Sequence, residues 1–110
     1  MSDSQTSVAE LKQLVQEFVE ARRWREFHTP KNLATSILIE GAELCEHFQW
    51  LTPEQSLELA GQVDASSPIA EELADIFSYV LATANALEVD LSEALRRKML
   101  KNAIKYPLPD

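Results

Sequence analysis

Two pairs of carboxylates interrupt the most apolar stretches of this chain, in the segments Glu40–Glu43 and Glu72–Asp75. The acids of each pair are three residues apart, so on a helix they lie on one side with Cβ atoms roughly 5–6 Å apart. A carboxylate on an apolar helix face is costly unless a positive group neutralises it. Few basic residues lie nearby in the sequence, so the pattern favours a bound divalent cation.

The composition is typical of an all-α protein. Glycine occurs only twice in 110 residues, and proline stands outside the apolar periodic runs. Alanine, leucine and glutamate, which are good helix formers, are abundant. The length suits one core, so we expect residues 1–110 to form a single all-α domain, a helical bundle of four to five helices.

Helix start signals recur along the chain. Ser7 and Glu10 form a capping box ahead of an apolar periodic run, and further caps stand at Thr29, Thr52, Ser67 and Asp90. Proline follows three of these caps at the first helical position. We expect the second helix to run to about Trp50, the third to near Gly61, the fourth to about Leu87 and the last to near Lys105.

The two long helices place their acids on the apolar face. At about 100° per residue, Glu40 and Glu72 fall within the apolar stripes of their helices, and Glu43, Asp75 and Tyr79 fall at the margins. The stripe residues are Leu33, Ile37 and Leu44 in the second helix and Ile69, Ile76 and Val80 in the fourth. An ordinary amphipathic helix carries its acids on the opposite face. We therefore expect the two pairs to face one another across a helix pair.

Four oxygen ligands without a cysteine or histidine cluster select a hard cation, Mg²⁺ or Mn²⁺. A di-iron bundle is the competing interpretation, but it needs Glu-x-x-His motifs on two helices. Neither histidine supplies one: His28 precedes the second helix, and His47 stands four residues beyond Glu43. The sequence has no glycine-rich phosphate loop, so phosphates would be held by the cation and by side chains.

Two groups of side chains are candidates for substrate contacts. The last helix carries basic and amide groups, which could bind phosphate or could complement the helix dipole. Tryptophans near the ends of the first two helices could stack on a base or could pack in a small core. These residues are Lys98, Lys101, Asn102, Lys105 and Tyr106 in the first group, and Trp24, His28 and Trp50 in the second.

The charge balance excludes some partners. The net charge is −8, with 18 acidic residues against 10 basic, whereas duplex nucleic acid requires a basic surface. No apolar run approaches the ~20 residues of a transmembrane helix, and no signal peptide opens the chain. The single cysteine, Cys45, predicts a buried helical thiol and a reducing, cytoplasmic location.

Taken together, these residues resemble the all-α nucleoside triphosphate pyrophosphohydrolases of the MazG-like superfamily. The hallmark of that superfamily is ExxE, a spacer and ExxD on two facing helices. Within it, the sequence is most similar to the dCTP pyrophosphatase branch. The matching segments are Trp24–Leu33, Glu43–Trp50, Glu71–Tyr79 and Lys98–Pro107, and the likeness covers about residues 10 to 107.

The resemblance implies Mg²⁺-dependent hydrolysis of a nucleoside triphosphate, with dCTP or related dNTPs favoured, to the monophosphate and pyrophosphate. It implies house-cleaning of the nucleotide pool by a homo-oligomer, a dimer or a homotetramer built of two dimers, that completes the helical bundle. Carried over by position, the metal ligands are Glu40, Glu43, Glu72 and Asp75. Among these four acids, we choose Glu43 as the base that orients the attacking water. Trp24 and Trp50 would flank the base with His28 nearby, and Tyr79, Lys98, Asn102, Lys105 and Tyr106 would contact sugar or phosphates.

Two readings from other function classes stay open on the sequence. One is a non-catalytic helical interaction protein whose acids lie on the surface, and the other is a metal-binding regulator without turnover. Pyrophosphate release from dNTPs with Mg²⁺ separates the enzyme from both. Titration of Mg²⁺ without substrate separates the regulator from the interaction protein.

Overall fold

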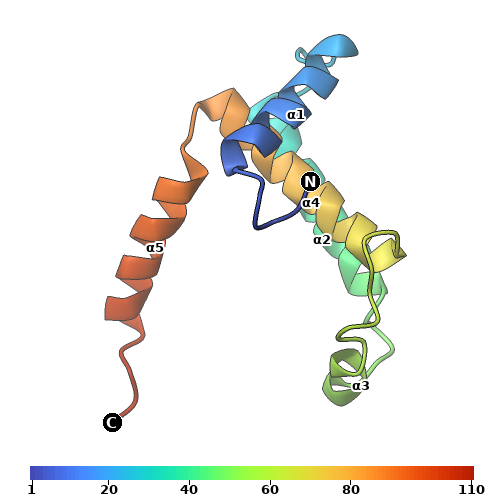
Figure 1. Cartoon of the computed structure of the whole chain (residues 1–110), viewed down its shortest axis with the longest axis vertical. Helices are drawn as coiled ribbons and strands as arrows, with labels where there is room; N and C mark the ends of the chain where they lie inside the picture. The colour runs from blue at the N-terminus through green and yellow to red at the C-terminus, as the bar shows by residue number, and fades with distance from the viewer.

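A computed structural model describes all residues from 1 to 110 and contains five α-helices and no strand (Figure 1). The prediction of an all-α fold is therefore confirmed. The helices are α1 (Val8–Ala21), α2 (Pro30–Glu46), α3 (Pro53–Leu57), α4 (Pro68–Leu87) and α5 (Leu91–Lys105).

Every helix begins at the capping residue that the sequence indicates. The side chains of Ser7, Thr29, Thr52, Ser67 and Asp90 each accept a hydrogen bond from a backbone N–H in the first turn. The predicted capping box at Ser7 is present, and a second one joins Thr52 and Gln55. These caps satisfy backbone donors that a helix start leaves free, which fixes where each helix begins.

Two helices end earlier than the sequence predicts. α2 ends at Glu46 rather than near Trp50, because the N–H of Phe48 bonds the carbonyl of Cys45, three residues back. α3 ends at Leu57 rather than near Gly61, and its continuation is also a series of three-residue turns. Hydrogen bonds between residues three apart wind the backbone more tightly than those of an α-helix, so the α-helix ends where they begin. The ends of α4 at Leu87 and α5 at Lys105 are as predicted.

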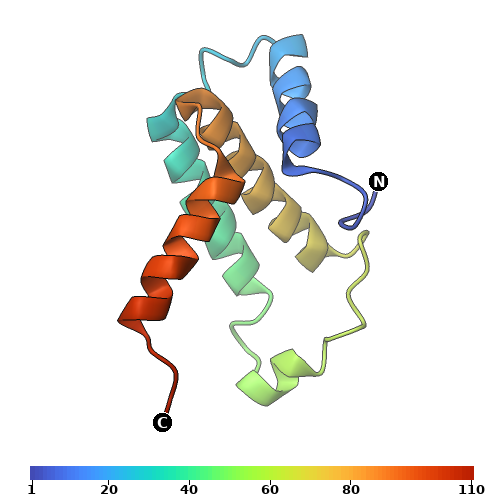
Figure 2. The ribbon, with the colours of Figure 1, turned by 60° about the vertical axis from the view of Figure 1, so that its left-hand side comes forward.

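An antiparallel pair of long helices, α2 and α4, forms the centre of the molecule, and α1 packs against α4 (Figures 1 and 2). The buried side chains come from these three helices and are few: Val19, Leu33, Leu81, Ala82 and Ala84. α1 is fastened to the carboxyl end of α4 by two hydrogen bonds. The Lys12 Nζ donates to the carbonyl of Val89, and the Asn85 amide donates to the carbonyl of Lys12.

α5 extends away from the other helices and has no buried residue (Figure 1). It exposes four large apolar side chains, Leu95, Met99, Leu100 and Ile104. The accessible surface of the chain is 8910 Å², whereas a compact monomer of this mass exposes about 6,100 Å². The radius of gyration is 16.5 Å, against about 13 Å for a compact domain of this length. One chain alone therefore leaves much apolar surface uncovered.

Cys45 is exposed, so the prediction of a buried thiol is wrong. Cys45 stands seven residues after Leu38, which is 74% exposed, and both lie on the side of α2 that faces away from α4. No helix of the chain has the length and apolarity needed to cross a membrane.

Candidate metal and nucleotide site

Three carboxylates meet where α2 crosses α4. Glu40 and Glu43 come from adjacent turns of α2, and Glu72 comes from the first half of α4. Each offers an oxygen, and these oxygens all lie within 4.8 Å of one another. Because α2 and α4 run antiparallel with their apolar stripes in contact, the acids within those stripes are brought together. The first pair, Glu40 and Glu43, thus faces Glu72, the first acid of the second pair, across the two helices.

The fourth acid, Asp75, stands one turn further along α4 and is exposed. It lies outside the group of three, yet its charge acts on Glu40. Its side chain also lines an adjoining cavity, described below. Asp75 therefore joins the acid cluster to the neighbouring hollow.

The acid cluster is electrostatically strained in the absence of a cation. A proton shared with Glu43, together with burial and the charges of Glu43 and Asp75, raises the pKa of Glu40 from 4.5 to about 7. One oxygen each of Glu40 and Glu72 is buried and has no hydrogen-bond partner. Buried oxygens of this kind are normally paired. An all-oxygen donor set with unpartnered buried oxygens fits a hard divalent cation such as Mg²⁺ or Mn²⁺.

A histidine that the sequence analysis set aside reaches this cluster. The Nε2 of His47 lies 3.8 Å from Oε1 of Glu72. Sequence spacing did indicate the contact in part, because His47 follows Glu40 by seven residues and so lies on the same side of α2. The partner is on α4, and no pattern within α2 identifies it.

An aromatic cavity of about 490 Å³ opens beside Asp75, between α1 and α4. The ring centroids of Trp24 and His28 are 6.2 Å apart in a stacked arrangement, and those of His28 and Tyr79 are 6.4 Å apart. The lining is mainly apolar, with Asp75 and Ser78 among the polar members. A flat, partly polar ring fits such a hollow, because aromatic walls favour stacking.

Several lining residues of this cavity were not predicted as site residues, among them Leu14 and Phe18 on α1. The Phe18 ring packs edge-on against Trp24, with centroids 5.6 Å apart. Phe18 is 48% exposed. The sequence signal for it was its position in the apolar run of the first helix, which is equally typical of a core residue.

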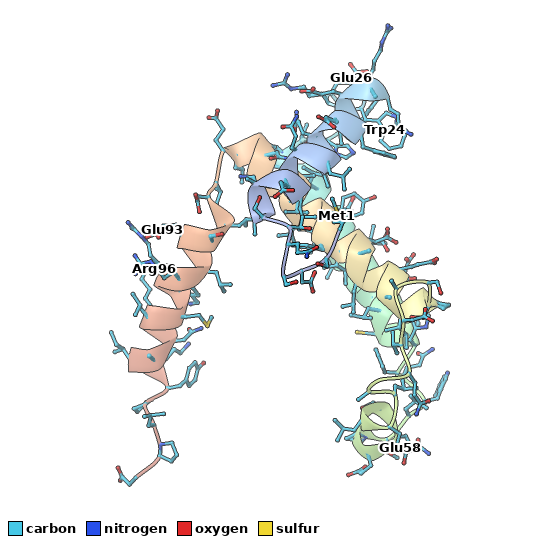
Figure 3. The ribbon with its side chains drawn as sticks, in the orientation of Figure 1. Met1, Trp24, Glu26, Glu58, Glu93 and Arg96 are labelled. Atoms are coloured by element: carbon cyan, nitrogen blue, oxygen red, sulfur yellow. The ribbon has the colours of Figure 1, made fainter.

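The remaining predicted substrate residues lie apart from the acids within one chain. Trp50, in the turn after α2, is 86% exposed. Lys98, Lys105 and Tyr106 are exposed and Asn102 is half-buried, all on or just after α5. Figure 3 shows Arg96 and Glu93 on that helix, on the opposite side of the molecule from Trp24. The chain thus unites Trp24, His28 and Tyr79 with the acids but leaves the α5 group and Trp50 separate.

The MazG-like family model matches residues 35–110, which contain both acid pairs and α5. A solved structure of a pyrophosphatase from Archaeoglobus fulgidus has 38% sequence identity and a TM-score of 0.83, over 98% of this chain and 99% of that one. Bovine dCTP pyrophosphatase 1 is 35% identical over 105 residues, 96% of this chain and 62% of the relative. Human dCTP pyrophosphatase 1 is 34% identical over 101 residues, 92% of this chain and 59% of the relative.

This chain therefore spans about three fifths of the length of the curated relatives that it matches. The match to the pyrophosphatase structure, in contrast, extends over almost all of both chains. The paired acids on α2 and α4, the five-helix order and the identities over most of the chain agree with one another. On these grounds, the chain belongs to the MazG-like family.

Proposed function

We propose that this chain is a nucleoside triphosphate pyrophosphohydrolase that converts a dNTP to the monophosphate and pyrophosphate, with dCTP or a related dNTP as the preferred substrate. The observation that carries the proposal is the junction of the acid cluster with the aromatic cavity, made by Asp75. A cation site beside a base-sized hollow suits a substrate that is a base at one end and a triphosphate at the other. The names of the dCTP pyrophosphatase relatives support the same substrate class.

Glu40, Glu43, Glu72 and Asp75 would hold Mg²⁺ or Mn²⁺. The unpartnered buried oxygens of Glu40 and Glu72 support this assignment. When bound, the cation neutralises negative charge on the phosphates and polarises the bond that is cleaved. Glu43 is the group that we assign to hold and orient the attacking water, because its carboxylate lies within the acid cluster beside Glu40 and Glu72.

The base would occupy the aromatic cavity against Trp24, with His28 and Tyr79 completing its wall. Lys98, Asn102, Lys105 and Tyr106 would contact sugar or phosphates, and Trp50 would cover the base from the other side. These five residues lie away from the acids of their own chain, so we assign them to the site of a neighbouring subunit.

The assembly that we propose is a homo-oligomer, a dimer or a tetramer built as a dimer of dimers. The large accessible surface and the apolar residues exposed on α5 support it. Side chains on the outer faces of α2 and α4 support it too, because Leu38, Ile39, Leu73 and Phe77 are all exposed. A second copy would cover this surface.

The wider role that we propose is removal of unwanted nucleotides in the cytoplasm, where dNTPs are present. Residues 1–110 would act as one MazG-like pyrophosphohydrolase domain. The net charge of −8 suits a substrate delivered with its own cation and disfavours a nucleic-acid duplex.

A panel of canonical and modified dNTPs, with and without Mg²⁺, tests the proposal. Pyrophosphate and the monophosphate should appear together, in equal amounts, and only with the divalent cation. Release of inorganic phosphate instead would mean cleavage of the terminal bond and would contradict it. Absence of any hydrolysis, with Mg²⁺ still bound, would favour the metal-binding regulator.

A further inference from the structure

His47 is the one basic side chain in contact with the acid cluster. Its Nε2 lies 3.8 Å from Glu72 Oε1, whereas the other ion pairs of the chain join Glu93 to Arg96 and Arg97 on α5. The His47 and Glu72 side chains are 28% and 19% exposed. Their contact is therefore partly shielded from water, which strengthens electrostatic interactions relative to an open surface.

The position of His47 follows from the helix geometry. Glu40, Glu43 and His47 have the i, i+3, i+7 spacing that keeps side chains on one side of a helix. His47 caps the end of α2 and keeps a helical backbone, with φ −68° and ψ −19°, so the row continues through it. Glu72 on α4 faces this row and contacts its members from the opposite side.

Glu72 has no other basic group beside it. Within the cluster it interacts with Glu40, whose pKa it helps to raise, and its Oε2 is buried without a hydrogen-bond partner. The neighbouring carboxylates of Glu40 and Glu43 repel it. Without a donor on its outer side, the Glu72 carboxylate would be free to turn away from a cation site.

We infer that His47 is a positioning residue for Glu72: its Nε2–H donates to Oε1 and leaves Oε2 directed at the cation. This inference rests on the metal site proposed above. The neutral imidazole with its proton on Nε2 is a sufficient donor, so the role requires no change of protonation. The separation of 3.8 Å is longer than the roughly 2.9 Å of a hydrogen bond, so the inference includes a closer approach of the two side chains when the cation is bound.

Titration of the full-length protein with Mn²⁺ alone, without nucleotide, tests this role by calorimetry. His47→Leu removes the donor at similar volume, and His47→Gln keeps an amide N–H the same number of bonds from Cα. Loss of a group that orients a metal ligand lowers metal affinity by roughly 10- to 100-fold. We expect a rise in Kd of this size for His47→Leu and recovery of most of the affinity for His47→Gln.

Glu46→Gln is the matched control, because Glu46 is the preceding residue, is exposed, and makes no hydrogen bond or ion pair. It should keep the Mn²⁺ affinity of the original protein. Circular dichroism verifies that each variant is folded, and His47→Ala replaces His47→Leu if the leucine variant is not. In turnover assays, the Mg²⁺ concentration for half-activation should rise in His47→Leu, while kcat at saturating Mg²⁺ changes little.

Three results would overturn the inference. The first is an unchanged Mn²⁺ Kd in the donor-free variant, and the second is an equal loss in His47→Leu and His47→Gln. The third is a nitrogen bonded directly to Mn²⁺ in pulsed electron paramagnetic resonance, which would make His47 a ligand. A starting protein that binds no Mn²⁺ would refute the proposed metal site and this inference with it, whereas the first two results refute the inference alone.

Discussion

Glu40 and Glu72 meet across the contact between α2 and α4, and each has one buried oxygen without a hydrogen-bond partner. Burying an unpaired carboxylate oxygen costs free energy. The same packing that brings Leu33 and Leu81 into the core forces these acids together. A cation that engages both oxygens removes this cost, so cation binding and stability are linked in this fold.

Mg²⁺ should raise the melting temperature of the protein at neutral pH. A ligand that binds only the folded state stabilises it by about 2.7 kcal/mol at a concentration 100 times its Kd. The shift should grow when a non-hydrolysable dNTP is added, because the substrate phosphates complete the coordination of the cation. Thermal unfolding followed by circular dichroism measures both shifts.

The double variant Glu40→Gln/Glu72→Gln is the control for this shift, since it keeps side-chain volume and removes the two charges. Its melting temperature should be insensitive to Mg²⁺. A shift of equal size in the variant and the original protein would locate the bound cation elsewhere.

Without metal, the free energy of unfolding should fall as the pH rises from about 4.5 to about 7. The pKa of Glu40 is raised in the folded protein, so in this window the folded state holds a proton that the unfolded chain has lost. The contribution is present below the unfolded pKa and disappears as Glu40 deprotonates beside Glu43. Urea unfolding in the presence of a chelator, at several pH values in this window, measures it.

Comparison with Glu40→Gln isolates the contribution of this one carboxyl, because other acids titrate in both proteins. The stability difference between the variant and the original protein should change in favour of the variant as the pH rises. A difference that is constant over the whole window would contradict the raised pKa.

Glu43→Gln should abolish turnover and leave the protein folded. Glutamine keeps the volume but lacks the charge that orients water and holds the cation, and loss of one such group costs roughly 10²–10³ in rate. Pyrophosphate release by the purified variant is the measurement, with Glu46→Gln on the next turn as the control. Activity equal to that of the original protein would remove Glu43 from the site.

Much of the fold could be predicted from the sequence because local sequence signals determine where the helices begin. Caps at Ser7, Thr29 and Ser67 depend on contacts within three residues, and each is present. The meeting of Glu40 with Glu72 was also predictable, because each acid interrupts an apolar stripe that must be buried against another. Signals of these two kinds are independent of the details of tertiary packing.

The wrong or missing predictions concern features that no local sequence signal marks. The early ends of α2 and α3 arise in tight turns for which no proline or glycine marks the point of exit. Cys45 was predicted to be buried from its residue type, but its side of α2 has no partner within the chain. The role of His47 requires knowledge of which residue of α4 lies opposite it, and helix periodicity alone does not give that register.

Trp24→Ala should weaken dNTP binding by about 1–3 kcal/mol, the usual contribution of one stack between a base and an aromatic ring. Trp24 lines the cavity beside Asp75 and contacts both Phe18 and His28 through its ring. Affinity for Mn²⁺ alone should be nearly unchanged, because the acids lie on α2 and α4, whereas Trp24 lies in the segment between α1 and α2. A Michaelis constant unaffected by the substitution would exclude the cavity as the base site.

Oligomer formation should be necessary for activity, because one chain leaves α5 and Trp50 away from the acid cluster. Sedimentation should show a dimer or tetramer at micromolar concentration. Leu100→Asp places a charge among the apolar side chains exposed on α5, so it should yield a helical but dissociated protein with little turnover.

Trp50→Ala should weaken dNTP binding by about 1–3 kcal/mol without dissociation if this tryptophan covers the base of a neighbouring subunit. Leu57→Ala, an exposed position on α3, is its matched control. A monomer that hydrolyses dNTPs at the full rate would refute the shared site, and an unaltered Michaelis constant in Trp50→Ala would remove that tryptophan from it.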